Sequence, residues 1–121
     1  MGSPVVHFEI QTSDPKTLKD FYADQFDWNV QWMDEPMSYG MCETQGGRGI
    51  DGGIAPAAEE TGQQVTFYVE VDDIEKKLAG IEAAGGKTAV PRTELPMVTF
   101  ALFTDPQGNL VGLVEPDPQQ A

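Results

Sequence analysis

Cysteine and basic residues are scarce in this chain of 121 residues. The single cysteine, Cys42, excludes an intrachain disulfide and a zinc site built from several cysteines. Seven Lys and Arg stand against twenty Asp and Glu, and the formal net charge of −13 disfavours binding to nucleic acids or anionic membranes. No apolar run approaches the roughly 20 residues of a membrane span, and no secretory signal opens the chain. These absences predict a cytoplasmic protein.

What the chain does contain is enough apolar material for one globular core. Hydrophobic residues make up 40% of the sequence. A chain of this length buries roughly two thirds of its unfolded surface on folding. We therefore expect a single domain over residues 1–121.

Two halves of the chain carry the same order of predicted elements. Alternation of apolar and polar residues predicts a first strand near Val5, and three- and four-residue spacing predicts a helix capped by Ser13 or Asp14. A shift of 59 residues places His7 on Thr66. The expected strands are 5–10, 28–33, 38–44 and 49–54, then 65–71, 88–90, 97–103 and 109–115. The second helix begins after Asp72 or Asp73 and ends before Gly85-Gly86.

This repeat predicts an α+β fold of two βαβββ modules that form a curved mixed sheet around one cleft. Module one is expected over 4–55, a linker over 56–63, module two over 64–115 and a tail over 116–121. The first strand of each module has one apolar face, which must cover the helix. The opposite faces carry mainly polar side chains and are expected to line the cleft. They are His7, Glu9 and Gln11 in module one, and Thr66, Tyr68 and Glu70 in module two.

The chain resembles the vicinal oxygen chelate superfamily, which contains glyoxalases, bleomycin-resistance proteins and extradiol dioxygenases. Within it, the chain is similar to the branch of predicted enzymes related to lactoylglutathione lyase. The matching stretches cover nearly the whole chain in order. They are residues 7–10, 14–28, 52–54, 69–73, 85–86 and 105–113.

The resemblance implies four positions at which the superfamily's enzymes hold a divalent metal. Carried onto this chain, they are His7, Gly52 or Gly53, Thr66 and Gly112. Only His7 offers a competent ligand, whereas a catalytic zinc site normally needs three. Asp51, Glu9 or Tyr68 would have to depart from the family geometry to replace the missing ligands. We therefore expect no metal or other cofactor.

His7 and Glu9 are the candidate catalytic residues, because an imidazole and a carboxylate share one strand face. The alternative is a hydrogen bond that satisfies two buried polar groups. The candidate ligand-binding residues are Thr66, Tyr68, Gly52, Gly53, Met97 and Gly112. The glycines either enlarge the cleft or mark bulges and bends.

Three further groups of residues have both a functional and a structural interpretation. Methionine and aromatic side chains are typical of an adaptable pocket, but equally of a core or a dimer interface. They are Trp28, Trp32, Met33, Met37, Tyr39, Met41 and Met97. Arg48 and Arg92 can each bind a carboxylate or phosphate, or simply lie at the surface. Cys42 has no basic neighbour in sequence, so a structural thiol is favoured over a nucleophile.

Two functions are consistent with these features. The first is a homodimeric binding protein that sequesters, carries or senses a small, largely apolar molecule, as bleomycin-resistance members of the superfamily do. The second is a lyase, isomerase or epimerase that uses His7 and Glu9. The fold alone cannot distinguish these two functions, so the residues of the functional site have to distinguish them.

Overall fold

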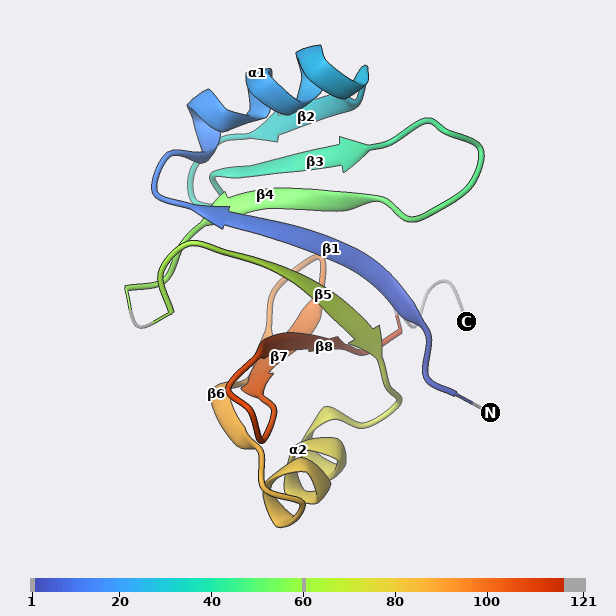
Figure 1. Ribbon diagram of the computed structural model, residues 1–121, viewed down its shortest axis with the longest axis vertical. Helices are drawn as coiled ribbons and strands as arrows, with labels where there is room; N and C mark the ends of the chain where they lie inside the picture. Colours follow the sequence, from blue (N-terminus) through green and yellow to red (C-terminus); the bar gives the residue numbers. More distant parts are fainter. Residues whose placement is uncertain (1, 60, 117–121) are drawn as a thin grey trace. The chain divides into compact units, whose positions relative to one another are not determined.

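The computed structural model describes residues 2–59 and 61–116 (Figure 1). They form two compact units. The first unit comprises residues 7–66, and the second comprises the described residues up to Val6 and from Phe67 onward. Position 60 of the expected linker and positions 117–121 of the expected tail lie outside the described residues.

The first unit holds one helix against a four-stranded mixed sheet. Its elements are β1 (Val5–Thr12, from residue 7), α1 (Pro15–Phe26), β2 (Asn29–Met33), β3 (Tyr39–Glu43) and β4 (Gly52–Pro56). The strand order is β2-β3-β4-β1, with β1 parallel to β4 and the other pairs antiparallel.

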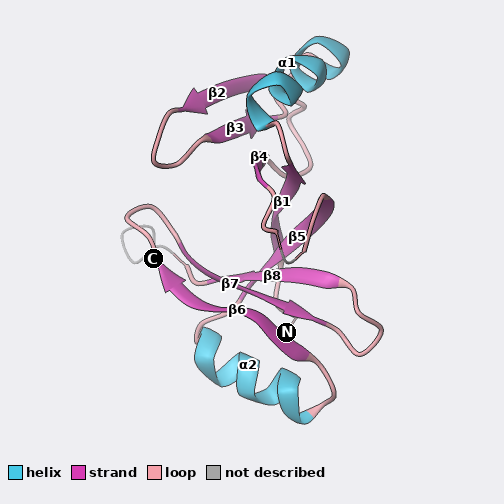
Figure 2. Cartoon of the chain, turned by 90° about the vertical axis from the view of Figure 1, so that its left-hand side faces the viewer, coloured by secondary structure: helices cyan, strands magenta, loops and turns pink. Residues whose placement is uncertain are grey.

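The second unit repeats this arrangement. Its elements are β5 (Gln64–Glu70, from residue 67), α2 (Ile74–Ala83), β6 (Lys87–Glu94), β7 (Thr99–Thr104) and β8 (Leu110–Val114). The order is β5-β8-β7-β6, with β5 parallel to β8 and the other pairs antiparallel. Figure 2 shows α2 lying along β6. The prediction of an α+β fold built from two βαβββ modules with mixed pairing is therefore confirmed.

Both helices begin where the sequence predicts. The Asp14 carboxylate accepts a hydrogen bond from the Thr17 amide at 3.2 Å, and Pro15 occupies the first turn. Asp73 accepts from the Lys76 amide at 3.1 Å. Such side-chain caps satisfy amides that have no partner within the helix. Within the described residues, neither helix is long and apolar enough to cross a membrane.

Two predicted strand boundaries differ from the structure by three residues or more. β6 continues through Pro91 to Glu94 instead of ending at Val90, with shifts of register on the way. Proline is tolerated there because β6 is the outermost strand of its unit's sheet and carries bulges. β4 begins at Gly52 rather than Gly49, because the chain from 46 to 49 bends before pairing starts.

The core of each unit lies between its helix and its sheet. In the first unit it centres on Ile10, Cys42 and Ile54. In the second it centres on Ile74 and Leu113. The first core includes Ile10 and Phe8 of the apolar face predicted for β1, and the second includes Val69 and Val71. Val65 and Phe67, which the sequence also placed on the apolar face of β5, are instead 73% and 43% exposed.

Candidate functional site

The first unit carries a chain of hydrogen-bonded side chains on the sheet face that points away from α1. The Tyr39 hydroxyl on β3 donates to Glu9 Oε2 at 3.1 Å, and its oxygen lies 2.9 Å from His7 Nε2. Gln11 Nε2 donates to Glu9 Oε1 at 3.0 Å. Because a phenol has one hydrogen, already directed to Glu9, the imidazole Nε2–H is the donor to Tyr39. The structure thus brings the two predicted catalytic residues together through a tyrosine.

Gly53 is what lets Tyr39 reach this position. The strand register places Gly53 beside Glu9, on the same sheet face. A Cβ atom added to Gly53 would overlap the Tyr39 ring and hydroxyl. Gly52 belongs to the other face, where an added Cβ would meet the Phe8 ring. Of the two candidate positions, Gly53 is therefore the one on the His7 face.

The second unit contains a matching pair of a glycine and a tyrosine. A Cβ atom added to Gly112 on β8 would overlap the ring of Tyr68 on β5. In both units a tyrosine ring fills the space that the missing side chain would occupy. The interpretation that these glycines enlarge a cleft is therefore wrong.

The sequence predicted a polar sheet face around Tyr68. In the structure this face is largely apolar. Tyr68 is only 5% exposed and packs against Leu102 and Leu110, with Val90 and Phe100 beside them. Its neighbour on the same strand face, Thr66, is 4% exposed. The prediction failed because alternation along β5 says nothing about the apolar side chains that β7 and β8 present to it. Met97, the remaining ligand candidate, is 60% exposed between β6 and β7.

Burial sets the protonation of His7. It lowers the pKa of the imidazole below its ordinary value, and the carboxylates of Glu9 and Asp51 oppose this only in part. His7 is accordingly neutral at pH 7, which agrees with a single proton placed on Nε2.

We predict that His7 titrates below the ordinary value of about 6.5 in a pH titration followed by NMR. Glu9→Gln should lower the pKa further, because it removes a charge that stabilises imidazolium. Since the unfolded chain takes up this proton first, stability should fall as pH drops from above 6.5 through the folded pKa. Asp24→Asn, an equal charge change on exposed α1, is the control. A His7 pKa above 6.5 would contradict the prediction.

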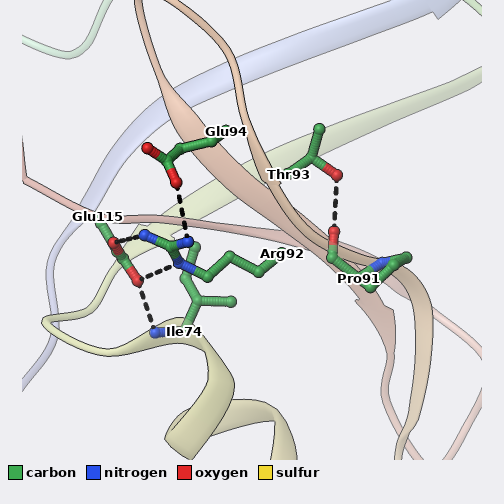
Figure 3. Close-up of polar contacts among 6 residues, drawn as sticks. All are labelled: Ile74, Pro91, Arg92, Thr93, Glu94 and Glu115. Atoms are coloured by element: carbon green, nitrogen blue, oxygen red, sulfur yellow. Dashed lines mark hydrogen bonds and ion pairs between the residues drawn. The ribbon is translucent and has the colours of Figure 1, made fainter.

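Arg92 on β6 is engaged internally (Figure 3). Its Nε and Nη2 donate to the two carboxylate oxygens of Glu115 at 3.1 and 3.0 Å, and Nη1 donates to Glu94 at 3.3 Å. Glu115 also accepts from the Ile74 amide at the start of α2, at 3.0 Å. These contacts hold the pKa of Glu115 below its usual range. Arg92 thus joins β6, β8 and α2, which favours its structural interpretation. Arg48 lies in the exposed β3–β4 loop.

Cys42 is 1% exposed in the core of the first unit. Burial, with a smaller contribution from Asp51, raises the pKa of its thiol to about 11. The thiolate that a nucleophile requires is therefore scarce at pH 7.

We predict that Cys42 in the native protein reacts with the thiol reagent DTNB at least about a hundredfold more slowly than in the urea-unfolded chain. The measurement is the rate of absorbance change with and without urea, and Cys42→Ser supplies the blank. Equal rates in both states would contradict the buried placement.

A surface pocket of about 370 Å³ lies at the start of α1. Trp32 and Asp34, from the end of β2, form part of its wall, and the indole donates to the Asp34 carboxylate at 3.0 Å. Trp32 aligns with Gly40, whose added Cβ would face Ile54 of the core. The pocket is thus on the α1 side of the sheet, away from His7.

Residues 5–113 match the model of the Glyoxalase/Bleomycin resistance protein/Dioxygenase superfamily. The chain belongs to this superfamily. The glyoxalase fold recurs in a superfamily member from Vibrio splendidus, at 19% identity over 94% of this chain and 98% of that one, with a TM-score of 0.62. It recurs in the methylmalonyl-CoA epimerase of Mycobacterium tuberculosis, at 16% identity over 96% and 89%, with a TM-score of 0.68. At such identities the likeness shows the fold alone.

A curated relative matches a smaller part of this glyoxalase-family chain. The protein named "Putative glyoxylase CFP32" from Mycobacterium tuberculosis is 39% identical over 54 residues. The match covers 44% of this chain and 21% of that protein. This chain thus aligns with only about a fifth of the length of the relative.

The residues at the superfamily's metal positions do not fit a metal. His7 is the only strong donor among them, and Tyr39 lies over Gly53 with its hydroxyl bonded to His7 and Glu9. Among the residues that the structure describes, no three His, Cys, Asp or Glu side chains are grouped to hold one. Tyr39, which the sequence placed only in an apolar set, is the site residue that sequence reasoning missed. One signal in the sequence could have identified Tyr39. A glycine stands at one of the superfamily's metal-ligand positions, and a tyrosine stands on the neighbouring predicted strand.

Proposed function

We propose that this protein is a small-molecule-binding member of the glyoxalase/bleomycin-resistance superfamily with a degenerate metal site. Its ligand would bind at the sheet face of the first unit that carries His7, Glu9 and Tyr39. The observation that carries the proposal is the pair of contacts from one phenol to the imidazole and the carboxylate. His7 and Glu9 are the two groups on this face best suited to bind a metal, and they are thereby linked to each other through the Tyr39 hydroxyl.

The same sheet face offers apolar contact for the body of a ligand. Strand alternation places Met33 and Met41 on the side of Tyr39 and Gly53, and both methionines are half-buried. Flexible thioether side chains adapt to different apolar shapes. A small, largely apolar molecule with one polar group suits this combination.

The proposal is tested by two measurements on protein purified without chelator. Inductively coupled plasma analysis should find far less than one transition metal per chain. A thermal-shift screen should identify apolar ligands that stabilise the protein equally with and without EDTA, and less well in Tyr39→Phe. A stoichiometric metal, or ligand binding that EDTA abolishes, would overturn the proposal.

A second candidate function is that of a lyase, isomerase or epimerase acting through His7 and Glu9. It is favoured by the neutral imidazole and the carboxylate that share one phenol, which is an arrangement suited to moving a proton. The epimerase among the similar folds is compatible with it. Ligands from the screen should be incubated with the protein and followed by NMR for turnover. Turnover that His7→Ala abolishes would favour the enzyme over the binding protein.

We also infer a cytoplasmic homodimer that binds neither nucleic acid nor membranes. The net charge of −13 supports the last two points. The exposed rings of Phe21 (53%) and Phe26 (58%) on α1 support self-association. Light scattering after gel filtration should give twice the 13.2 kDa of the chain. A mass of 13.2 kDa would overturn the dimer.

A further inference from the structure

The strands β2 and β6 stand at the two ends of the strand order, so each has one edge that pairs with no other strand among the described residues. Figure 1 shows β2 as the outermost strand of the first unit, next to β3. The unpaired N–H and C=O groups of such an edge are a template on which another chain can add a strand. Natural proteins protect these edges with charged side chains, prolines or bulges.

β6 has all three protections, whereas β2 has none of them. β6 contains Pro91, its pairing with β7 shifts register twice, and its charged residues are Lys87, Arg92 and Glu94. The five residues of β2 include no charged residue, proline or glycine, and they pair with β3 in one unbroken register. In the part of the chain that the structure describes, turns and loops make no backbone hydrogen bond to β2. The edge of β2 is therefore open to a partner strand.

The sequence around β2 suits a second copy of this chain as that partner. The net charge is −13, yet residues 28–33 carry no charge, so two copies can meet there without placing like charges on the paired strands. Phe26 is 58% exposed, and its ring centroid lies 5.5 Å from that of Trp28, which directly precedes β2. An exposed apolar ring beside an open edge is a surface that a symmetric partner would cover.

Two β2 strands are complementary to each other when they pair antiparallel. A two-fold axis at Gln31, the middle residue, is the arrangement that pairs all five residues. It places Val30 opposite Trp32 of the second copy, and an aromatic residue opposite a β-branched one is a favourable cross-strand pair. Val30 and Trp32 are each only half-buried within one chain. The pairing would cover apolar surface that each copy leaves exposed.

We infer that two copies of this chain join through the outer edges of their β2 strands, antiparallel and with the two-fold axis at Gln31. This inference rests on the homodimer proposed above and assigns its interface. The first unit's sheet would continue from one copy into the other. The strand register places Gln31 beside Met41 and Met33 beside Tyr39, so the ligand faces of the two copies would border each other.

Cysteine cross-linking tests both the edge and the register. Opposite Cα atoms of an antiparallel pair lie about 4.5 to 5.5 Å apart, within the range of a disulfide. In oxidised glutathione, Gln31→Cys should therefore run as a covalent dimer on a non-reducing gel. Asn29→Cys is the matched control on the same strand face, because the two copies of position 29 would be about 14 Å apart and should remain unlinked. Cys42 is 1% exposed and does not compete.

Light scattering after gel filtration provides the second measurement. Gln31→Lys would place two like charges opposite each other and should lower the mass to the 13.2 kDa of one chain. Gln107→Lys, the same change in the exposed turn between β7 and β8, should leave the dimer intact.

The outcomes separate this interface from the homodimer itself. A dimer that persists in Gln31→Lys, or equal cross-linking at positions 29 and 31, would overturn the β2 interface and leave a homodimer joined through another surface. A wild-type mass of 13.2 kDa would overturn the homodimer together with this interface, and would leave the proposed ligand binding intact.

Discussion

Gly112→Ala is expected to reduce the free energy of unfolding by about 2 to 3 kcal/mol, in the range of overpacked cores. The added methyl group would overlap the Tyr68 ring, which lies buried against Leu102 and Leu110. The ring has no exposed side toward which it can swing, so the cost falls on the apolar cluster. Urea denaturation followed by circular dichroism measures the change.

Gly80→Ala is the matched control for this substitution. Gly80 lies within α2, is exposed, and an added Cβ would meet nothing within 4 Å. Alanine there should stabilise the protein by about 0.5 to 1 kcal/mol, because it lowers the entropy lost on helix formation. The two variants should therefore move in opposite directions. A Gly112→Ala protein as stable as the wild type would show that Tyr68 does not occupy this position.

Gly53→Ala is expected to weaken binding of an apolar ligand identified by the thermal-shift screen at least about tenfold while leaving the fold in place. The methyl group would take the place of the Tyr39 hydroxyl, and the half-buried ring must turn away. His7 and Glu9 then lose the group that joins them. The affinity from an NMR titration and the nuclear Overhauser contact between Tyr39 and His7 report both effects.

Two variants isolate the cause of this loss. Tyr39→Phe keeps the ring but removes the hydroxyl, so it should reproduce most of the loss of affinity. Gly46→Ala, in the β3–β4 loop, places a methyl group at ordinary contact distance from the Arg48 carbonyl and should change nothing. Retention of the contact between Tyr39 and His7 in Gly53→Ala would contradict the assigned geometry.

The parts of the fold that the sequence predicted well are those governed by local chemistry. Asp14 with Pro15, and Asp73, mark helix starts because a carboxylate cap and a preset φ act within one turn. The repeat at a spacing of 59 residues located both modules before any contact was known. The extension of β6 past Pro91 was missed, because whether a proline interrupts a strand depends on whether that strand is an edge.

The candidate site was only half predictable. Alternation along β1 was enough to place His7 and Glu9 on one polar face. The role of Tyr39 depends on a glycine in the next strand of the sequence and on the register that brings both together. The apolar surroundings of Tyr68 come from β7 and β8 in the same way. Pairings between distant strands are set by the whole sheet, and one sequence does not reveal them.

The pairing of a glycine with a covering tyrosine also constrains how this protein can evolve. A single codon change that placed a metal-binding side chain at position 53 would drive it into Tyr39, and the same holds at position 112 for Tyr68. A ligand side chain at either position would need a smaller residue at the tyrosine position, so the two substitutions of each pair are energetically coupled. Bringing the superfamily's ligand types to positions 53 and 112 thus requires coupled changes at two pairs of sites.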